Sequence, residues 1–347
     1  MMHAFTDSPE QARVINAPND DDILVVAGAG SGKTYTMTRR IVTLIGNGVA
    51  PERILGLTFT RKAAGELLDR VSSAVAEQSG ADEDPDRMFL KPTIATYDAF
   101  FQTIVRQYGL LVGFDRNTQP LSDAGALQLA ADVVERHLDE LSARQDPPSI
   151  PQLAGNVRSL SNAIASAMIG PDCPGYAEAV AAIRRWDGAF ISRVRAALGD
   201  EPIPEKLFAG AAPKRAKKDS DEQWQAKLEQ YQAKLYANCV YQCDRIARTA
   251  EQRELLLDLV EEYNEEKRRR TMAEFGDFTI AAYQLVSRFP SIGRRYRERF
   301  SHVLLDEYQD TSTTQAMLLA ALFHPDDGGP CSAVSAVGDP FQSIYAW

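Results

Sequence analysis

The stretch ILVVAGAGSGKT at residues 23–34 decides the fold of this 347-residue chain. Its first four residues are apolar and mostly β-branched, which is typical of a strand, and a glycine-rich loop and the start of a helix follow. Glycines let such a loop turn its backbone N–H groups inward, toward phosphate oxygens. Lys33 adds a positive charge for the β and γ phosphates, and the Thr34 hydroxyl is a suitable Mg²⁺ ligand. The stretch therefore predicts a binding site for a nucleoside triphosphate.

The residues after this loop predict a helix whose positive end faces the phosphates. Apolar side chains recur at helical spacing, at Met37, Ile41, Leu44 and Ile45. The sequence Gly46-Asn47-Gly48 predicts where the helix ends. Ala27 stands where the strict pattern of a phosphate-binding loop has glycine. Because a strand and a helix flank the loop, we interpret it as a phosphate-binding loop in spite of this difference.

A second motif places two adjacent carboxylates after an apolar run. Residues 303–305, VLL, predict a strand, and the sequence DEYQD follows at 306–310. Ligands bind at the carboxyl ends of the strands in open parallel sheets, so both carboxylates are expected beside the nucleotide. We expect Asp306 to hold Mg²⁺, mainly through water, and Glu307 to position and deprotonate the water that attacks the γ phosphate. A solvated acidic loop is the alternative for this run alone, and the neighbouring phosphate-binding loop disfavours it.

The composition, 44% hydrophobic and 25% charged, is typical of a globular protein, and the length allows two domains. No run approaches the roughly 20 apolar residues of a membrane-spanning helix, and the N-terminus lacks the pattern of a signal peptide. Cys239 and Cys243 stand one helical turn apart, but two ligands do not make a metal site. The four cysteines show no paired framework, which predicts free thiols and a reducing cytoplasm.

The formal net charge of −10 argues against a nucleic-acid partner, although only as a weak indication. Phosphate contacts need only a local basic path. Four basic runs offer one, at 61–62, 214–218, 267–270 and 294–297. Each run is equally compatible with a solvated helix face.

The order of the predicted elements indicates an α/β fold. Strands are expected at 23–26, 54–59, 93–96, 303–305 and 333–337, with helical patterns between the first three. Such alternation predicts a parallel sheet. Charged, Ala- and Leu-rich stretches occupy 123–142, 222–247 and 250–270, and strand signals are absent there. We therefore expect a discontinuous nucleotide-binding domain, 1–110 plus 273–347, interrupted by a helical accessory domain at 111–272.

Five motifs follow the sequence PEQ at 9–11 in a fixed order. They are AGAGSGKT at 27–34, LTFTRKAA at 57–64, ATYDAF at 95–100, LLDEYQDT at 304–311 and VGDPFQSIYAW at 337–347. This series resembles the N-terminal motifs of UvrD/Rep/PcrA-type superfamily 1 DNA helicases. The resemblance implies a RecA-like P-loop motor domain with an inserted helical domain, and ATP-dependent 3′ to 5′ translocation on single-stranded DNA. It further implies a role in DNA repair or recombination and partners that include DNA with junctions between single and double strands.

The resemblance also implies roles for individual residues. Gln11 matches the glutamine that reads adenine, which implies ATP with Mg²⁺ as the cofactors, and an amide can make this pairing. Gln342 matches the residue that senses the γ phosphate, so it joins Lys33, Asp306 and Glu307 as a catalytic candidate. The predicted nucleotide-binding residues are Gln11, Ala27, Gly28, Ala29, Gly30, Ser31, Gly32, Lys33, Thr34 and Tyr35, with Thr34 and Asp306 as metal ligands. The predicted DNA-binding residues are Phe59, Thr60, Arg61, Thr96, Tyr97, Tyr345 and Trp347.

The chain departs from the family pattern at several points. Tyr35 stands where the family usually has an arginine that packs on adenine, and 96–99 reads TYDA rather than Thr-Phe-His-Ser. The insertion is longer than in the simplest members, which leaves open a relative of the nuclease-fused RecB or AdnA/AdnB class. The chain stops at Trp347, inside the last motif, so we expect the second motor domain to be absent from it. On that expectation the chain alone binds ATP and barely hydrolyses it.

Two other classes of protein share part of this pattern. A P-loop kinase or small GTPase has the phosphate-binding loop but needs neither the paired carboxylates at 306–307 nor the aromatic residues near 345. A nucleotide-gated DNA-binding module without catalysis is the second alternative. Glu307 argues against it, because a protein that only binds nucleotide does not need a base for water. Stimulation of ATP hydrolysis by single-stranded DNA in the complete protein would distinguish the three.

Overall fold

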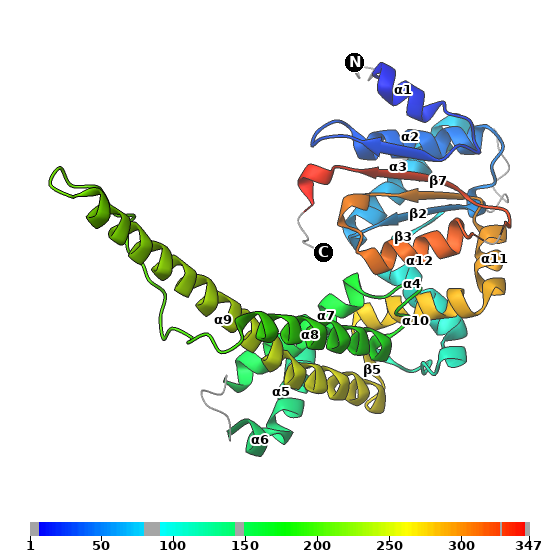
Figure 1. Ribbon diagram of the computed structural model, residues 1–347. Coiled ribbons are helices and arrows are strands. Elements are labelled where there is room, and N and C mark those ends of the chain that lie inside the picture. The colour runs from blue at the N-terminus through cyan, green and yellow to red at the C-terminus, as the bar shows by residue number, and fades with distance from the viewer. Residues whose placement is uncertain (1–6, 80–90, 143–148, 327, 344–347) are drawn as a thin grey trace.

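The computed structural model of the chain describes residues 7–79, 91–142, 149–326 and 328–343. Its centre is a five-stranded sheet with the order β1-β7-β6-β2-β3, in which all neighbouring strands are parallel (Figure 1). The strands are β1 (Ile23–Val26), β2 (Ile54–Thr58), β3 (Thr93–Thr96), β6 (His302–Leu305) and β7 (Ala333–Gly338). Each lies where an apolar run predicts it, and the α/β class with a parallel sheet is confirmed.

Helices cover both faces of this sheet because successive side chains of the central strands point to opposite sides. Leu55 and Val303 belong to one hydrophobic cluster, and their neighbours Ile54 and Leu304 belong to the other. Three groups of helices pack around these clusters. They are α1 (Pro9–Ile15), α2 (Lys33–Gly46) and α3 (Arg61–Ser79); α4 (Tyr97–Tyr108) and α10 (Phe275–Arg288); and α11 (Pro290–Arg299) and α12 (Thr313–Phe323).

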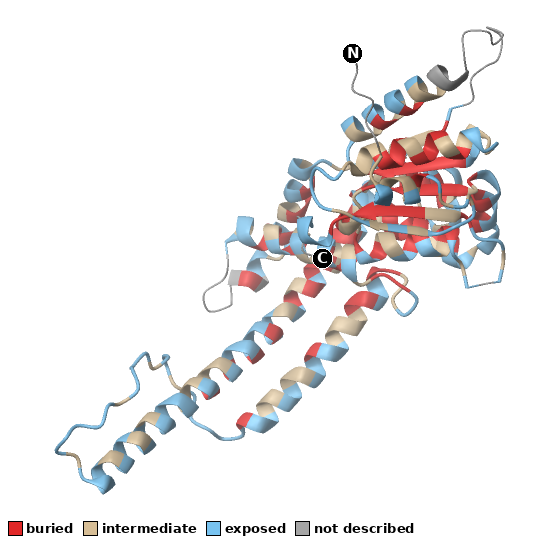
Figure 2. Ribbon diagram, turned by 90° about the horizontal axis from the view of Figure 1, so that it is seen from above, coloured by how far each residue is buried: buried red, intermediate tan, exposed pale blue. Residues whose placement is uncertain are grey.

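A long helical segment lies between α4 and α10. It contains α5 (Asp123–Arg136), α6 (Leu138–Ser142), α7 (Ile150–Ala167), α8 (Tyr176–Leu198) and α9 (Asp221–Arg269). The two stretches expected at 222–247 and 250–270 form one continuous helix of 49 residues, α9. Thr249, between them, lies within this helix, and its hydroxyl donates to the carbonyl of Arg245 at 2.9 Å, one turn back. Helices α8 and α9 form a hairpin that projects from the body, and Figure 2 shows its far end largely exposed.

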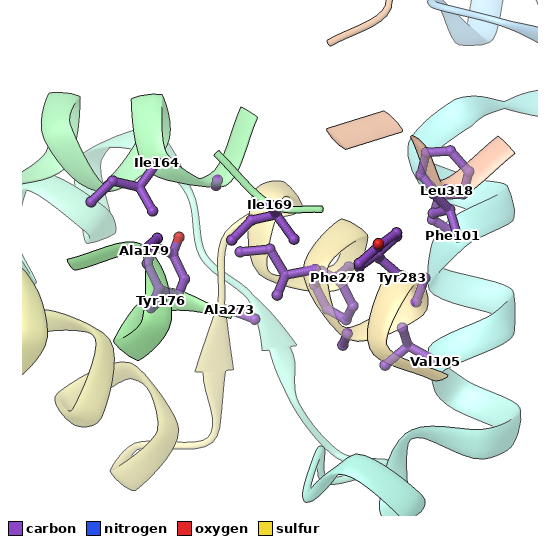
Figure 3. Packing of buried hydrophobic residues seen from close by; sticks show 14 of the residues in the cluster. Phe101, Val105, Ile164, Ile169, Tyr176, Ala179, Ala273, Phe278, Tyr283 and Leu318 are labelled. Atoms are coloured by element: carbon purple, nitrogen blue, oxygen red, sulfur yellow. The ribbon is translucent and has the colours of Figure 1, made fainter. Parts of the chain in front are cut away.

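The chain enters and leaves the helical segment at neighbouring points. Strand β4 (Gln119–Pro120) pairs with β5 (Met272–Ala273) in a parallel two-stranded ladder, so the two crossings are hydrogen-bonded to each other. The base of the segment shares one hydrophobic cluster with the sheet helices, and Figure 3 shows Ile164 and Tyr176 of the segment near Phe278 of α10. The segment is therefore fixed at its base while the end of its hairpin packs only on itself. In the described part of the chain, no helix is both long and apolar enough to cross a membrane.

Candidate nucleotide site and adjoining groove

The glycine-rich loop connects β1 to α2 and is held by backbone contacts. Gly30 and Gly32 have φ of +74° and +83°, a left-handed conformation that glycine adopts without steric cost. Ala27 does not have a positive φ, and its N–H donates to the carbonyl of Gly338 at 3.1 Å. Alanine therefore fits where the strict pattern has glycine. Gly32 is the N-cap of α2 and has no side chain to bind the first helical N–H groups, which leaves them available to an anion.

Lys33 begins α2, and its side chain turns back toward the loop. Its Nζ donates to the carbonyl of Ala27 at 3.2 Å and lies 4.0 Å from Oε2 of Glu307. Only 10% of the lysine side chain is exposed, so its charge lies inside the site rather than in bulk water. The motifs at 27–34 and 306–310, predicted separately, meet at this point.

Asp306 follows β6 at the carboxyl edge of the sheet and is buried. Its N–H donates to the carbonyl of Leu57 at 2.8 Å, and its Oδ1 accepts from the N–H of Glu307 at 3.1 Å. Burial, and next the charge of Glu307, raise the pKa of Asp306 to about 6. A cation bound at this carboxylate would favour its ionised form.

Thr34 and Asp306 fit a Mg²⁺ ion. Both supply oxygen atoms, which this hard cation prefers, and Mg²⁺ usually takes only one or two protein ligands beside phosphates and water. In the described ranges, no group of three or more His, Cys, Asp or Glu side chains forms a complete cage for a metal. The donor set therefore suits a cation that arrives with a triphosphate.

Glu307 is linked to the last motif through Gln309. The amide of Gln309 donates to Oε2 of Glu307 at 2.8 Å, and its Oε1 accepts from the N–H of Asp339 at 2.9 Å. Asp339 in turn accepts hydrogen bonds from the amide of Gln342 and from the N–H of Phe341. Gly338 leaves room for this contact, because a Cβ there would lie 2.5 Å from Oε1 of Gln309.

Sequence reasoning did not assign roles to Gln309 and Asp339. They stand 30 residues apart, and only the fold shows that they touch. The available signal was that both lie within motifs already singled out, DEYQD and VGDPFQ.

Gln11 and Tyr35 lie on the other side of the loop. The amide of Gln11 donates from Nε2 to the carbonyl of Ser31 at 3.0 Å, and its Oε1 accepts from the N–H of Ser8 at 2.9 Å. Tyr35, in the first turn of α2, donates its hydroxyl to Oδ1 of Asp7 at 2.7 Å. Both residues predicted to meet the nucleotide base are therefore close to the phosphate-binding loop.

A groove of about 700 Å³ lies between the sheet helices and the base of the helical segment. Phe59, which follows β2, lines the groove, and so does Phe275, which begins α10 and has 52% of its surface exposed. Arg158 of α7 also lines the groove and pairs with Glu274 at 3.0 Å and with Asp123. Phe275 and Arg158 were not predicted, because more than 90 residues separate each from Phe59 and only the fold brings them together.

Apart from Phe59 and Tyr97, the predicted DNA contacts divide into three groups. Thr60 and Thr96 are helix N-caps, whose hydroxyls accept from the N–H groups of Ala63 and Ala99 at 3.1 and 3.2 Å. Arg61 is exposed at the start of α3. Tyr345 and Trp347 lie outside the described residues.

Tyr97 corrects one prediction. Only 1% of it is exposed, which leaves no surface for a contact with DNA. Its ring lies 4.7 Å from that of Phe59, and its hydroxyl donates to the carbonyl of Asp306 at 3.1 Å. Through these two contacts Tyr97 links Phe59, which lines the groove, to the backbone of Asp306.

Comparison with known proteins gives one matching family, described as the UvrD/REP helicase N-terminal domain, over residues 7–347. An ATP-dependent DNA helicase UvrD1 from Mycobacterium tuberculosis is 29% identical over 98% of this chain and 34% of its own length. One of the subunits of an ATP-dependent helicase/nuclease from Streptococcus thermophilus is 26% identical over 97% of this chain and 35% of its own length. The chain thus spans about a third of the length of the curated relatives it matches.

Proposed function

The chain belongs to the UvrD/REP helicase family, as its N-terminal domain, and on this premise we propose that it is the ATP-binding first motor domain of an ATP-dependent DNA helicase. The observation that carries the proposal is the position of Lys33, 4.0 Å from Glu307 and beside Asp306. A cation for the phosphates and a base for the attacking water thus meet at the carboxyl edge of a parallel sheet. Because nucleotide binding alone needs no such base, the arrangement favours hydrolysis.

In the proposed reaction the loop at 27–32 and the first turn of α2 surround the triphosphate, and Lys33 contacts the β and γ phosphates. Mg²⁺ held near Thr34 and Asp306 would neutralise phosphate charge. Glu307 takes a proton from water while the water oxygen bonds to the γ phosphorus and the bond to the β–γ bridging oxygen breaks. Gln309 fixes the orientation of the Glu307 carboxylate through its 2.8 Å hydrogen bond.

Two glutamines complete the proposed nucleotide site. Gln11 reads the adenine edge, and Gln342 senses the γ phosphate. The hydrogen bonds from Glu307 through Gln309 and Asp339 to Gln342 support a link between hydrolysis and the loop that follows β7. This loop leads into the residues proposed to bind DNA.

We propose that efficient turnover also needs a second motor domain, as the family resemblance implies. Arginines supplied across a cleft stabilise the charge of the transition state and raise rates by roughly 10³ to 10⁵ in other NTPases. The relatives are about three times as long as this chain, which leaves room for such a domain in the complete protein.

We propose the groove as the path of single-stranded DNA, with 3′ to 5′ polarity. Phe59 and Phe275 offer two aromatic side chains in the groove, and base stacking contributes about 1–3 kcal/mol per base without sequence preference. The exposed Arg61 and the helix starts capped by Thr60 and Thr96 suit backbone phosphates. Tyr345 and Trp347 remain proposed stacking residues at the end of this path.

The division into domains is also part of the proposal. Residues 1–110 and 273–347 would form the motor domain, and 111–272 the accessory domain. The pairing of β4, a few residues after the first boundary, with β5 at the second supports this division.

A second candidate is the motor component of a helicase–nuclease that works in DNA repair or recombination. Similarity to the helicase/nuclease relative over nearly the whole chain favours it, and the motor chemistry is the same in both cases. The two candidates differ in whether the rest of the protein carries a nuclease.

Hydrolysis of ATP by the complete protein, measured with and without single-stranded DNA, tests the proposal. We expect Mg²⁺-dependent hydrolysis that DNA stimulates, and we expect Lys33→Ala to abolish both ATP binding and hydrolysis while the circular dichroism spectrum stays unchanged. Lys206→Ala is a matched control, because Lys206 is exposed and lies outside the nucleotide site and the basic runs. Unchanged ATP affinity in Lys33→Ala would refute the phosphate-binding assignment.

A further inference from the structure

Helix α1 is attached to α2 and its loop at three places along its length. At the front, the Tyr35 hydroxyl donates a hydrogen bond to Oδ1 of Asp7 at 2.7 Å. In the middle, Nε2 of Gln11 donates a hydrogen bond to the carbonyl of Ser31 at 3.0 Å. At the rear, the buried guanidinium of Arg40 donates to three backbone carbonyls, those of Ile15, Ala17 and Pro18. The orientation of α1 is therefore set by side chains of the nucleotide-binding helix.

The middle contact involves the amide that is proposed to read the base. Both ends of the Gln11 amide are engaged, Oε1 with the N–H of Ser8 and Nε2 with Ser31. The fit is close, because a Cβ on Gly32 would lie 2.8 Å from Nε2 of Gln11. Each atom of this amide keeps capacity for a base, because Nε2 carries a second N–H and Oε1 a second lone pair.

The front contact, between Tyr35 and Asp7, does not involve the Gln11 amide. Asp7 precedes the N-cap residue Ser8, and Tyr35 lies in the first turn of α2, two residues after Lys33. The hydrogen bond to Asp7 is the largest cause of a raised pKa of Tyr35, so the hydroxyl remains a donor at neutral pH. Asp7 and Tyr35 thus hold the beginning of α1 beside the loop whatever the partners of Gln11.

We propose that Tyr35, acting through Asp7, is a positioning residue that keeps Gln11 within reach of the nucleotide base and so sets the preference for adenine. This inference rests on the proposed function and deepens it. Adenine offers a donor and an acceptor on the edge that an amide reads, whereas guanine offers two acceptors there. A Gln11 amide that is fixed in one orientation distinguishes adenine from guanine. A Gln11 amide that can rotate does not distinguish them.

The experiment measures binding of MgATP, MgGTP and magnesium tripolyphosphate to the chain by calorimetry. We expect Tyr35→Phe and Asp7→Ala each to weaken ATP binding about fivefold to tenfold, the scale of one lost hydrogen bond. Binding of GTP and tripolyphosphate should not change, so the ratio of ATP to GTP affinity falls. The double variant Tyr35→Phe/Asp7→Ala should bind ATP no more weakly than either single variant. Asp7→Asn should behave as wild type because its amide oxygen still accepts, and Arg13→Ala, exposed on α1, is the surface control.

Three outcomes would overturn the inference. One is an unchanged ratio of ATP to GTP affinity in both Tyr35→Phe and Asp7→Ala. Another is an equal loss for ATP, GTP and tripolyphosphate, which would mean that the phosphate-binding loop itself is damaged. The third is additive losses in the double variant, which would mean that the two residues act separately. Failure of the wild-type chain to bind any of the three ligands would instead refute the proposed function.

Discussion

Glu307 has the most constrained backbone of the residues around the phosphate-binding loop. Of the non-glycine residues that the structure describes, only Thr271 and Glu307 have a positive φ, 55° and 49°. Such a conformation costs of order 1 kcal/mol or more, and it persists where surrounding contacts hold it. Here the contacts are Gln309 at 2.8 Å and Lys33 at 4.0 Å, which together keep the carboxylate directed into the site.

We expect Glu307→Gln in the complete protein to lower the maximal rate of ATP hydrolysis by about 10² or more, the usual scale for loss of a general base. Glutamine keeps the shape of the side chain, so ATP and DNA binding should persist. Steady-state hydrolysis and nucleotide binding, measured on the same preparation, check both parts. Glu298→Gln, exposed on α11, is the control. Hydrolysis at the wild-type rate would exclude Glu307 as the base.

The residues of the nucleotide site were easier to predict than their connections. Lys33, Asp306 and Glu307 could be named because each belongs to a short motif with a stated chemistry. The contact between Gln309 and Asp339 could not be predicted, because it depends on the pairing of β6 with β7. Tyr97 was placed in the DNA path because an aromatic residue in a motif looks the same in sequence whether it is exposed or buried.

The elements of the sheet follow from local sequence, and the long helix does not. Apolar runs of four to six residues are enough to predict strands, whereas the end of a helix needs a breaking signal. Neither glycine nor proline occurs between Asp221 and Arg269, so nothing interrupts α9. The two stretches predicted there are therefore parts of one helix, and the polar residues between them do not interrupt it.

The central strand β6 should give the protein a measurable acid sensitivity. His302 at its start is 7% exposed, and burial, followed by the charge of Arg40, lowers its pKa. The unfolded chain therefore binds a proton at a higher pH than the folded one. We expect the contribution of His302 to the free energy of unfolding in urea to fall as the pH drops below about 6.5, the ordinary histidine value, while the raised pKa of Asp306 acts in the opposite direction.

The variant His302→Leu should reduce this dependence on pH, because leucine cannot be protonated. His324→Leu is the control, since the side chain of His324 is 38% exposed. Equal slopes of stability against pH in wild type and His302→Leu would contradict the assignment.

The whole molecule combines a fixed junction with a projecting hairpin (Figure 1). One hydrophobic cluster joins the sheet helices to the base of the helical segment, and the groove runs along that junction. Phe59 and Phe275 therefore line a groove whose two sides are packed against each other. The groove also carries acidic side chains, Asp98, Asp123 and Glu274, so its electrostatic attraction for DNA is small.

From this arrangement we expect the chain alone to bind single-stranded DNA weakly and to lose most of that binding between roughly 50 and 200 mM salt. Its hydrolysis of ATP should be negligible and should not respond to DNA, because the proposed transition-state arginines belong to a second motor domain. Fluorescence anisotropy of a labelled oligonucleotide and a phosphate-release assay test this, with the complete protein as the comparison. Strong DNA-dependent hydrolysis by the chain alone would refute the two-domain mechanism.

The pairing of β4 with β5 also bears on how fast the protein folds. Strands β2 and β6 are neighbours in the sheet, yet their paired residues Ile54 and His302 are about 250 residues apart. Pairing of such distant strands is slow, because a long loop must close before the contact is gained. When the helical segment forms first and Gln119 meets Met272, the loop that remains shortens by about 150 residues. Prior folding of the segment should therefore accelerate closure of the sheet.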